Sequence, residues 1–150
     1  MKVVIQRVQE ASVTIDGNVY SFINKGLVVL VGIELADNSD DISWLANKIV
    51  QLRIFNDASN LMNQSLLDVN GELLVVSQFT LHAATKKGNR PSFMKAASPE
   101  IAIPLYEDFV KVLRVLSNSK VATGVFGADM KVSLVNDGPV TIVIDSKNKE

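Results

Sequence analysis

Two uninterrupted apolar segments constrain the fold of this chain more than any other feature of its sequence. Residues 27–33 read LVVLVGI, and residues 73–80 begin with LLVV; neither apolar run contains a charged residue. Runs of this length are typical of strands that are covered on both faces. They are too short to cross a bilayer, which takes about 20 apolar residues in a helix. The sequence therefore predicts a globular protein with two buried strands and no membrane segment.

The composition is consistent with a single domain over residues 1–150. Apolar residues make up 47% of the chain and charged residues 21%, so a sizeable core can form. The absence of cysteine excludes disulfides, thiol nucleophiles and zinc–thiolate sites. The first residues already carry Arg7 and Glu10 and include no apolar signal core, so we expect a cytoplasmic protein.

The formal net charge of −1 limits the contacts that this chain can make with nucleic acids. Proteins that bind long stretches of nucleic acid usually carry a basic footprint. No such footprint is present overall, so we expect no DNA partner. Any contact with RNA must be local.

The remaining elements are expected from the spacing of the apolar residues. Residues at helical spacing indicate two helices, one capped by Asn38 and ending near Arg53 or Phe55, and one starting at Ser98-Pro99. Alternating patterns indicate seven or eight strands. The strands are expected at residues 1–8, 11–15, 19–23, 27–33, 73–80, 121–126, 130–135 and 140–144.

Helices inserted singly among runs of strands predict an α+β fold, with a mixed or antiparallel sheet and both helices on one side of it. Pro104 is expected to disturb the first turns of the second helix, because proline lacks a backbone donor. Residues 56–60 and 84–91 are expected to be loops. The glycines of residues 124–127 are too close together to cradle a phosphate and indicate a bend or bulge.

The sequence offers little conventional catalytic or metal chemistry. It contains no HxH or HExxH pattern and no cluster of Asp and Glu at ligand spacing, so no metal or cofactor is expected. The single histidine, His82, lies two residues after Thr80, and on a continuing strand the two side chains would share a face. They could form a Thr–His pair, although a half-exposed histidine at a strand end is the favoured interpretation.

Polar residues end the second buried strand. Ser77, Gln78, Phe79 and Thr80 follow the apolar run directly. Buried polar groups cost free energy unless they find partners. This strand end therefore either lines a pocket or emerges into solvent.

A second unusual segment, NDGPVT at residues 136–141, separates two expected strands. Asp-Gly and Gly-Pro are common in tight turns, and a tight turn is the favoured interpretation. Alternatively, the glycine before Pro139 lets a ligand approach its carbonyl closely, and an X-Pro bond is able to be cis.

A third segment carries cations and an aromatic residue within a few positions. Lys86, Lys87, Arg90 and Phe93 could hold a phosphate and stack a base. A solvated loop is the alternative interpretation.

Together these segments resemble the D-aminoacyl-tRNA deacylase (D-tyrosyl-tRNA deacylase) family. The pieces IQRVQEASV, VVSQFTL, GNRPSF, ASPE and ADMKVSLVNDGPVT occur in the order and spacing of that family, over residues 1–144. SQFT (residues 77–80) and NDGPVT (residues 136–141), here called the first and second signatures, are specific as a pair at this separation. The resemblance implies a small β-roll or barrel-like domain that forms a tight homodimer. It also implies hydrolysis of the ester of D-aminoacyl-tRNA at its 3′-terminal adenosine.

The resemblance assigns the catalytic site to Ser77, Gln78, Phe79 and Thr80. In the preferred mechanism, backbone N–H groups around Phe79 and Thr80 form an oxyanion hole, and water attacks the ester with help from the ribose 2′-OH. Thr80 as the nucleophile is the alternative, but it has no assured base.

The resemblance also assigns residues that bind the substrate and reject L-amino acids. Gly138 and Pro139 match a Gly-cis-Pro element that enters the partner subunit's site, where its carbonyls crowd the position of an L side chain. D-residues and achiral glycine fit. Arg7 matches an arginine expected to orient this element, and Met130 is expected to line the adenosine pocket.

Two other functions remain open from the residues. A homodimeric RNA- or nucleotide-binding module could use Lys86, Lys87, Arg90 and Phe93 without catalysing a reaction. A general esterase or amidase could be built on Ser77 or Thr80.

Overall fold

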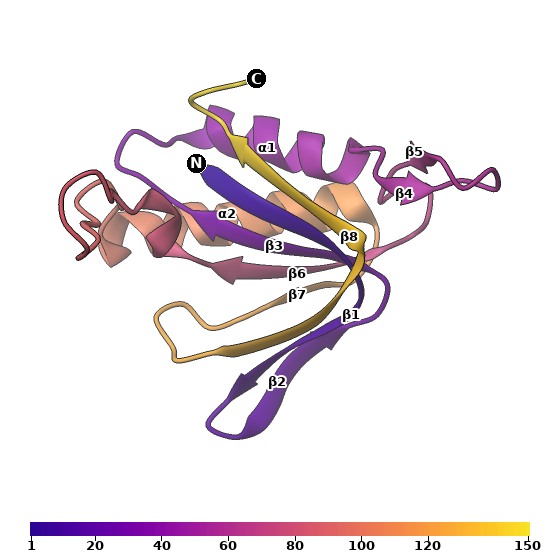
Figure 1. Cartoon of the computed structure of the whole chain (residues 1–150), viewed down its shortest axis with the longest axis horizontal. Coiled ribbons are helices and arrows are strands. Elements are labelled where there is room, and N and C mark those ends of the chain that lie inside the picture. The colour runs from indigo at the N-terminus through magenta and orange to yellow at the C-terminus, as the bar shows by residue number, and fades with distance from the viewer.

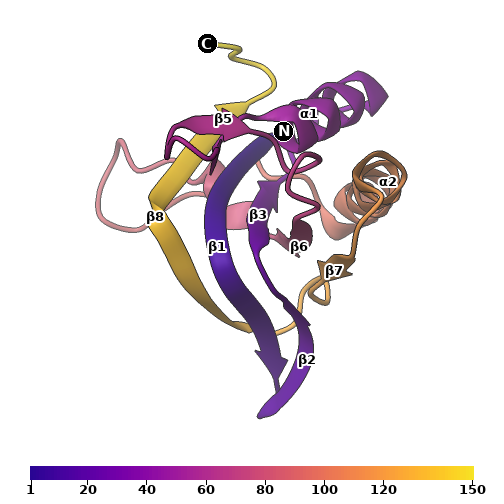
Figure 2. The same ribbon diagram turned by 90° about the vertical axis from the view of Figure 1, so that its right-hand side faces the viewer.

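The computed structural model describes residues 1–150 as a strongly curved sheet with two helices packed against one face (Figures 1 and 2). A short hairpin, β4–β5, lies outside this sheet. The strands are β1 (Lys2–Ile15), β2 (Asn18–Ile23), β3 (Gly26–Gly32), β4 (Phe55–Asn56), β5 (Met62–Gln64), β6 (Glu72–Ser77), β7 (Val121–Thr123) and β8 (Lys131–Asp145). The helices are α1 (Ser39–Gln51), the 3-10 turn η1 (Phe79–His82) and α2 (Pro99–Ser117).

β1 organises the sheet because it is long enough to pair with three other strands. It runs antiparallel to β2, β3 and β8, while β3–β6 and β6–β7 are parallel pairs. The Ser21 hydroxyl of β2 donates to the Thr123 carbonyl of β7 at 2.7 Å, so the sheet curls back toward itself as a nearly closed barrel (Figure 2). The predicted α+β class, with a mixed sheet and helices on one side, is confirmed.

The two central strands are buried on both faces, as their apolar runs predict. Leu27 and Val29 of β3 belong to the cluster between sheet and helices, whereas Val28 of β3 and Leu74 of β6 belong to the cluster inside the curl. All four side chains are fully buried. Burying an apolar side chain of this size contributes about 1.5–3 kcal/mol. The parallel β3–β6 pair is therefore the most firmly held part of the sheet.

Both helices begin close to the predicted residues. The Asn38 side chain accepts from the Asp40 N–H at 2.8 Å, and the Asp41 carboxylate accepts from the Asn38 N–H at 2.9 Å, which forms a capping box. In α2, Pro104 lies inside the helix without ending it, and the helix continues to Ser117. No helix of the chain combines the length and hydropathy that a membrane span requires.

The segment around Gly138 is not the tight turn that was favoured from the sequence. β8 is one continuous strand from Lys131 to Asp145, and it replaces the two predicted strands. β1 supports both halves of it, because Gln6 pairs with Thr141 and Val8 pairs with Asn136. Three residues of β8 are thus extra between the two pairs. They form an irregular bulge in a strand that runs on.

One further strand prediction needs correction. The strand predicted at residues 121–126 ends at Thr123, because the Gly124 N–H makes the last bond to β6, to the Val75 carbonyl at 3.2 Å. The loop predicted at residues 56–60 is confirmed for residues 57–60, which form the tip of the β4–β5 hairpin, while Asn56 belongs to β4. An Asp57 N–H bond to the Leu61 carbonyl at 2.8 Å closes this tip.

The end of β8 is fastened to α1 by buried polar groups. Asp41 accepts from the Ser146 hydroxyl and from the Lys147 ammonium, both at 2.7 Å. Burial by itself would raise the pKa of Asp41, but these bonds and the Asn38 N–H bring it down to about 2. The same contact with Asp41 raises the pKa of Lys147. Ionised Asp41 therefore stabilises the folded chain.

Replacing Asp41 by Asn is expected to lower the free energy of unfolding by about 1–2 kcal/mol at neutral pH. The folded pKa is depressed, so the contribution is complete above the ordinary value of 3.8 and is lost as the pH falls toward about 2. Urea unfolding of wild type and Asp41→Asn between pH 7 and about 2 measures this difference. Asp40→Asn, at an exposed acid in the same helical turn, is the control. Parallel curves over the whole range would contradict the assignment.

Candidate active site

The buried strand β6 ends in a 3-10 turn rather than continuing. The Gln78 N–H donates to the Val31 carbonyl of β3 at 2.7 Å, and the chain then forms η1 from Phe79. The prediction of a strand to Thr80 was therefore wrong. The first N–H groups of such a turn have no carbonyl partner within it, so those of Phe79 and Thr80 are free to bind a ligand. The Thr80 hydroxyl accepts a hydrogen bond from the Gln78 side-chain amide.

Ser77, Gln78 and Phe79 line one cavity together with Met130. The cavity has a volume of about 310 Å³ and mostly apolar walls. Its opposite wall is the segment 126–130, which leads from β7 to β8. An apolar cavity with a few polar groups at its edge is the usual form of a small-ligand site. The structure thus brings together three residues of the first signature with Met130, while Thr80 lies on the adjoining turn.

The predicted basic loop folds back onto η1. Phe93 packs edge-to-face on Phe79, with ring centroids 5.0 Å apart. Lys86, Lys87 and Arg90 are all exposed on this loop. None of the three lines the cavity, so they are placed to contact only a ligand that extends beyond it.

Gly138 and Pro139 lie in the bulge of β8 and are joined by a cis peptide bond. Both residues are exposed, and neither lines the cavity of the same chain. One chain therefore does not bring the two signatures together.

Arg7 binds the bulge of β8 through Asp137. Its guanidinium is buried and donates to the Asp137 carbonyl at 3.2 Å, and it forms an ion pair with the Asp137 carboxylate at 3.3 Å. It also donates to the Ile54 carbonyl at 2.6 Å and to the Asn56 side chain at 3.2 Å. A buried cation with several acceptors is held in one position. Arg7 thereby fixes the Asp137–Gly138 backbone relative to the β4–β5 hairpin.

His82 does not behave as the sequence suggested. It is buried rather than half-exposed, with only 3% of its surface accessible, and its Nε2 has no hydrogen-bond partner. It makes no hydrogen bond to Thr80, so the Thr–His pair is absent. The cause is η1, which turns His82 toward β3; a Cβ at Gly32 would lie 3.0 Å from the imidazole.

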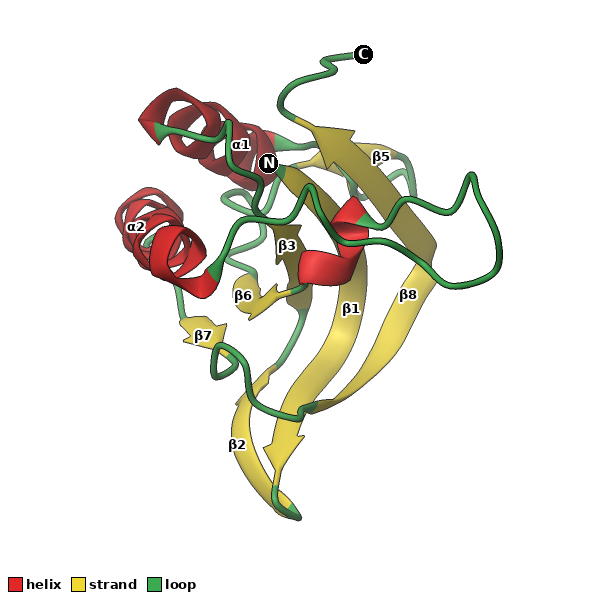
Figure 3. Cartoon of the chain, turned by 90° about the vertical axis from the view of Figure 1, so that its left-hand side faces the viewer, coloured by secondary structure: helices red, strands yellow, loops and turns green.

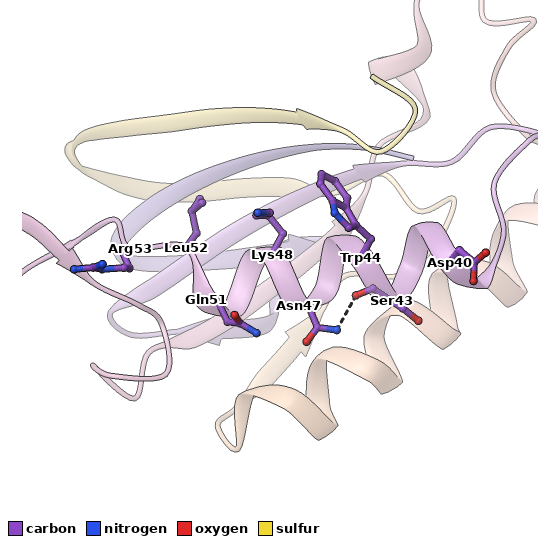
Figure 4. A pocket seen from close by; sticks show the side chains of 8 residues that line it. All are labelled: Asp40, Ser43, Trp44, Asn47, Lys48, Gln51, Leu52 and Arg53. Carbon is purple, nitrogen blue, oxygen red and sulfur yellow. Dashed lines mark hydrogen bonds between the residues drawn. The ribbon is translucent and has the colours of Figure 1, made fainter. Parts of the chain in front are cut away.

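The largest hollow of the molecule is a shallow groove of about 680 Å³ on the outer face of α1. Figure 4 shows its side chains spread along the helix surface. It contains none of the residues that the sequence singles out, so it is a poor candidate for the reaction site. Its lining residues are Asp40, Ser43, Trp44, Asn47, Lys48, Gln51, Leu52 and Arg53.

Comparison with known proteins assigns the chain to one family. The model of the family described as D-Tyr-tRNA(Tyr) deacylase matches residues 4–145. The chain belongs to this deacylase family. A D-aminoacyl-tRNA deacylase of Flavobacterium psychrophilum is 66% identical over the full length of both chains. One of Bacteroides fragilis is 64% identical, again over the full length of both.

Two solved structures share the fold of this chain. The chain superposes with a TM-score of 0.91 on a structure titled c-Myc DNA Unwinding Element Binding Protein, at 42% identity over 97% of this chain and 98% of that one. A structure titled as a probable eukaryotic D-amino acid tRNA deacylase has a TM-score of 0.82 over 95% and 97% of the two chains. At 18% identity, the second comparison supports the fold alone.

Sequence reasoning missed two residues that shape the cavity beside η1, Gly124 and Phe126. Phe126 forms part of its wall. A Cβ at Gly124 would lie 2.4 Å from the Met130 sulfur, so glycine here allows Met130 to pack beside β7. The only available signal was the pair of glycines at 124 and 127, which indicates a bend but no cavity.

Gly138→Ala is expected to lower the free energy of unfolding of the protein by about 2–3 kcal/mol. The glycine has φ +119°, and a Cβ would lie 2.8 Å from Nη2 of Arg7, whose guanidinium is held by the hydrogen bonds of its Nε and Nη1 atoms. Gly17→Ala is the matched control, because Gly17 also has a positive φ of +78° but no atom near the added methyl group. Its cost should stay near 1 kcal/mol. Urea unfolding of both variants measures the difference; equal losses would remove the role assigned to Arg7.

Proposed function

We propose that the protein hydrolyses the ester bond of D-aminoacyl-tRNA, releasing a free D-amino acid and tRNA and so removing wrongly charged tRNA from translation. Membership of the deacylase family supports this activity. The observation that carries the proposal is the 3-10 turn at the end of β6. This turn leaves the N–H groups of Phe79 and Thr80 without backbone partners, and Phe79 lines a cavity of about 310 Å³.

The proposed reaction uses backbone groups rather than a side-chain nucleophile. Water attacks the ester carbonyl carbon, and the N–H groups of Phe79 and Thr80 stabilise the oxyanion that forms. The ester C–O bond then breaks, and the ribose oxygen leaves with a proton. No side-chain base is placed to activate Thr80, because His82 makes no contact with its hydroxyl. The neighbouring ribose 2′-OH is therefore the group proposed to assist the water.

The proposed selectivity for D-residues comes from a second copy of the chain. Gly138 and Pro139 are exposed on β8 and do not line the cavity of their own chain. In a homodimer of single-domain chains, each bulge would enter the partner's cavity with carbonyl groups facing the substrate Cα. Main-chain atoms there exclude an L side chain whatever its chemistry. A D-residue, or the achiral glycyl group, would fit.

The proposed RNA contact beside the cavity is local. Lys86, Lys87 and Arg90 are exposed on the loop that Phe93 joins to Phe79, and they would bind phosphates near the 3′ end. Such a patch needs no basic footprint over the whole protein, in agreement with the net charge of −1. The cytoplasm, where aminoacyl-tRNA is used, is the proposed place of action.

The protein is expected to hydrolyse D-Tyr-tRNA at least about 100-fold faster than L-Tyr-tRNA. Loss of labelled amino acid from each tRNA, at matched protein concentration, measures the two rates. Equal rates, together with turnover of simple esters, would favour a general esterase. Binding of both tRNAs without hydrolysis would favour an RNA-binding module.

Thr80→Ala is expected to keep the single-turnover rate within about tenfold of wild type, because it removes the hydroxyl but keeps the backbone N–H. Thr80→Pro, which removes that N–H, is expected to lower the rate by about 100-fold or more. Circular dichroism and thermal unfolding check that both variants fold. A fall of about four orders of magnitude in Thr80→Ala would instead make the hydroxyl the nucleophile.

A further inference from the structure

A second hollow adjoins the candidate cavity on the side of α2 and β7. It has a volume of about 410 Å³, and Phe126 lines both spaces. Figure 3 shows α2, β7 and β2 following one another along this side of the molecule, next to the loop that leads to β8. Phe126 is therefore the boundary between the cavity and an outer surface formed by these elements.

The floor of the second hollow is held firmly. The Tyr106 ring packs edge-to-face on Phe126, with centroids 6.1 Å apart, and its hydroxyl donates to the Val75 carbonyl of β6 at 2.8 Å. Burial raises the pKa of Tyr106 to about 12, so the phenol stays neutral and keeps this bond. The position of Phe126 is thus tied to the strand that ends in the catalytic turn.

Aromatic rings continue outward from Phe126 along β2. Tyr20 lines the second hollow and is 55% exposed, and Phe22 is 53% exposed. The register of β2 shifts at Tyr20, so contacts rather than alternation place the two rings: Tyr20 lines the second hollow, and Phe22 contacts Lys120, the residue before β7. The Ser21–Thr123 hydrogen bond keeps this strand beside β7. Large exposed rings in a row usually mark a binding surface.

Cations lie beside these rings. Arg114 of α2 lines the second hollow with Tyr20, is exposed and takes part in no ion pair. The Lys120 ammonium lies 4.0 Å from the centre of the Phe22 ring. Lys111 also lines the hollow, but its charge is offset by Asp108 at 3.0 Å, and Glu107 stands nearby. Arg114 and Lys120 are thus the cations available to a ligand.

We infer that Phe126, Tyr20, Arg114, Phe22 and Lys120, here called the aromatic track, hold the single-stranded nucleotides just upstream of the terminal adenosine of the tRNA substrate. The inference rests on the proposed function, which places that adenosine in the cavity. Bases stack on aromatic rings without sequence preference, and cations between them neutralise the phosphates. The track begins at the cavity wall, where the chain of nucleotides must leave. It therefore places the nucleotides upstream of the adenosine on a different surface from the basic loop of Lys86 and Lys87, which is left to the phosphate of the terminal adenosine itself.

Three substrates of increasing length test the track: D-tyrosyl-adenosine, a D-tyrosylated cytidine-cytidine-adenosine trinucleotide, and D-Tyr-tRNA. Tyr20→Ala and Arg114→Ala are each expected to lower kcat/KM about 10-fold on the two longer substrates, mainly through KM. Hydrolysis of D-tyrosyl-adenosine, which has no upstream nucleotide, should stay within about twofold of wild type. Lys48→Ala, an exposed cation on α1, is the matched control and should change none of the rates.

The outcomes separate the track from the activity on which it rests. Equal losses on all three substrates would mean that the variants disturb the cavity, and would overturn the inference. So would unchanged kinetics in the track variants, with the loss appearing instead in Lys86→Ala and Lys87→Ala. If wild-type protein hydrolyses none of the substrates, the proposed function fails and the track falls with it. Hydrolysis of D-tyrosyl-adenosine by every variant keeps these two failures distinguishable.

Discussion

The burial of the parallel β3–β6 pair on both faces is the constraint on which the rest of the structure depends. Because these strands cannot shift without exposing apolar side chains to water, the point where β6 ends is fixed. The last bond, from the Gln78 N–H to the Val31 carbonyl, sets the start of η1. β1 lies beside β3 and carries both Arg7 and the pairing partners of β8. One buried pair thus positions both signature segments.

The sequence predicted the elements whose bounds are set by the pattern of their side chains. It failed for the elements whose bounds are set by backbone hydrogen bonds to distant strands. The apolar runs located β3 and β6, and the capping box located α1. The turn after Ser77 was missed because the β6–β3 hydrogen bonds end at the Val31 carbonyl of β3. The local sequence pattern around Ser77 carries no sign of that distant bond. The same limit applies to the bulge at Gly138, which two distant β1 residues hold within a continuous strand. His82 was misplaced because its burial follows from η1.

The candidate site was predicted in its residue types but not in its arrangement. Ser77, Gln78, Phe79 and Met130 meet around one cavity, although the pattern alone left a pocket and a solvent-exposed strand end equally open. The cavity wall at Phe126 could not be predicted, since it depends on how β7 stops short and the chain crosses to β8. Gly138 and Pro139 remain outside that cavity in one chain. Sequence resemblance, rather than physical pattern, connects them to it.

The free N–H groups of η1 belong to the main chain, and the same is true of the carbonyls in the β8 bulge. Every amino acid supplies the carbonyl, and every one except proline supplies the N–H, so a single substitution rarely deletes either group. Conventional alanine scanning would therefore leave the groups proposed for the site in place and report mainly changes in their orientation. If the reaction depends on main-chain groups, activity that survives a substitution at a signature residue says little about whether that residue takes part.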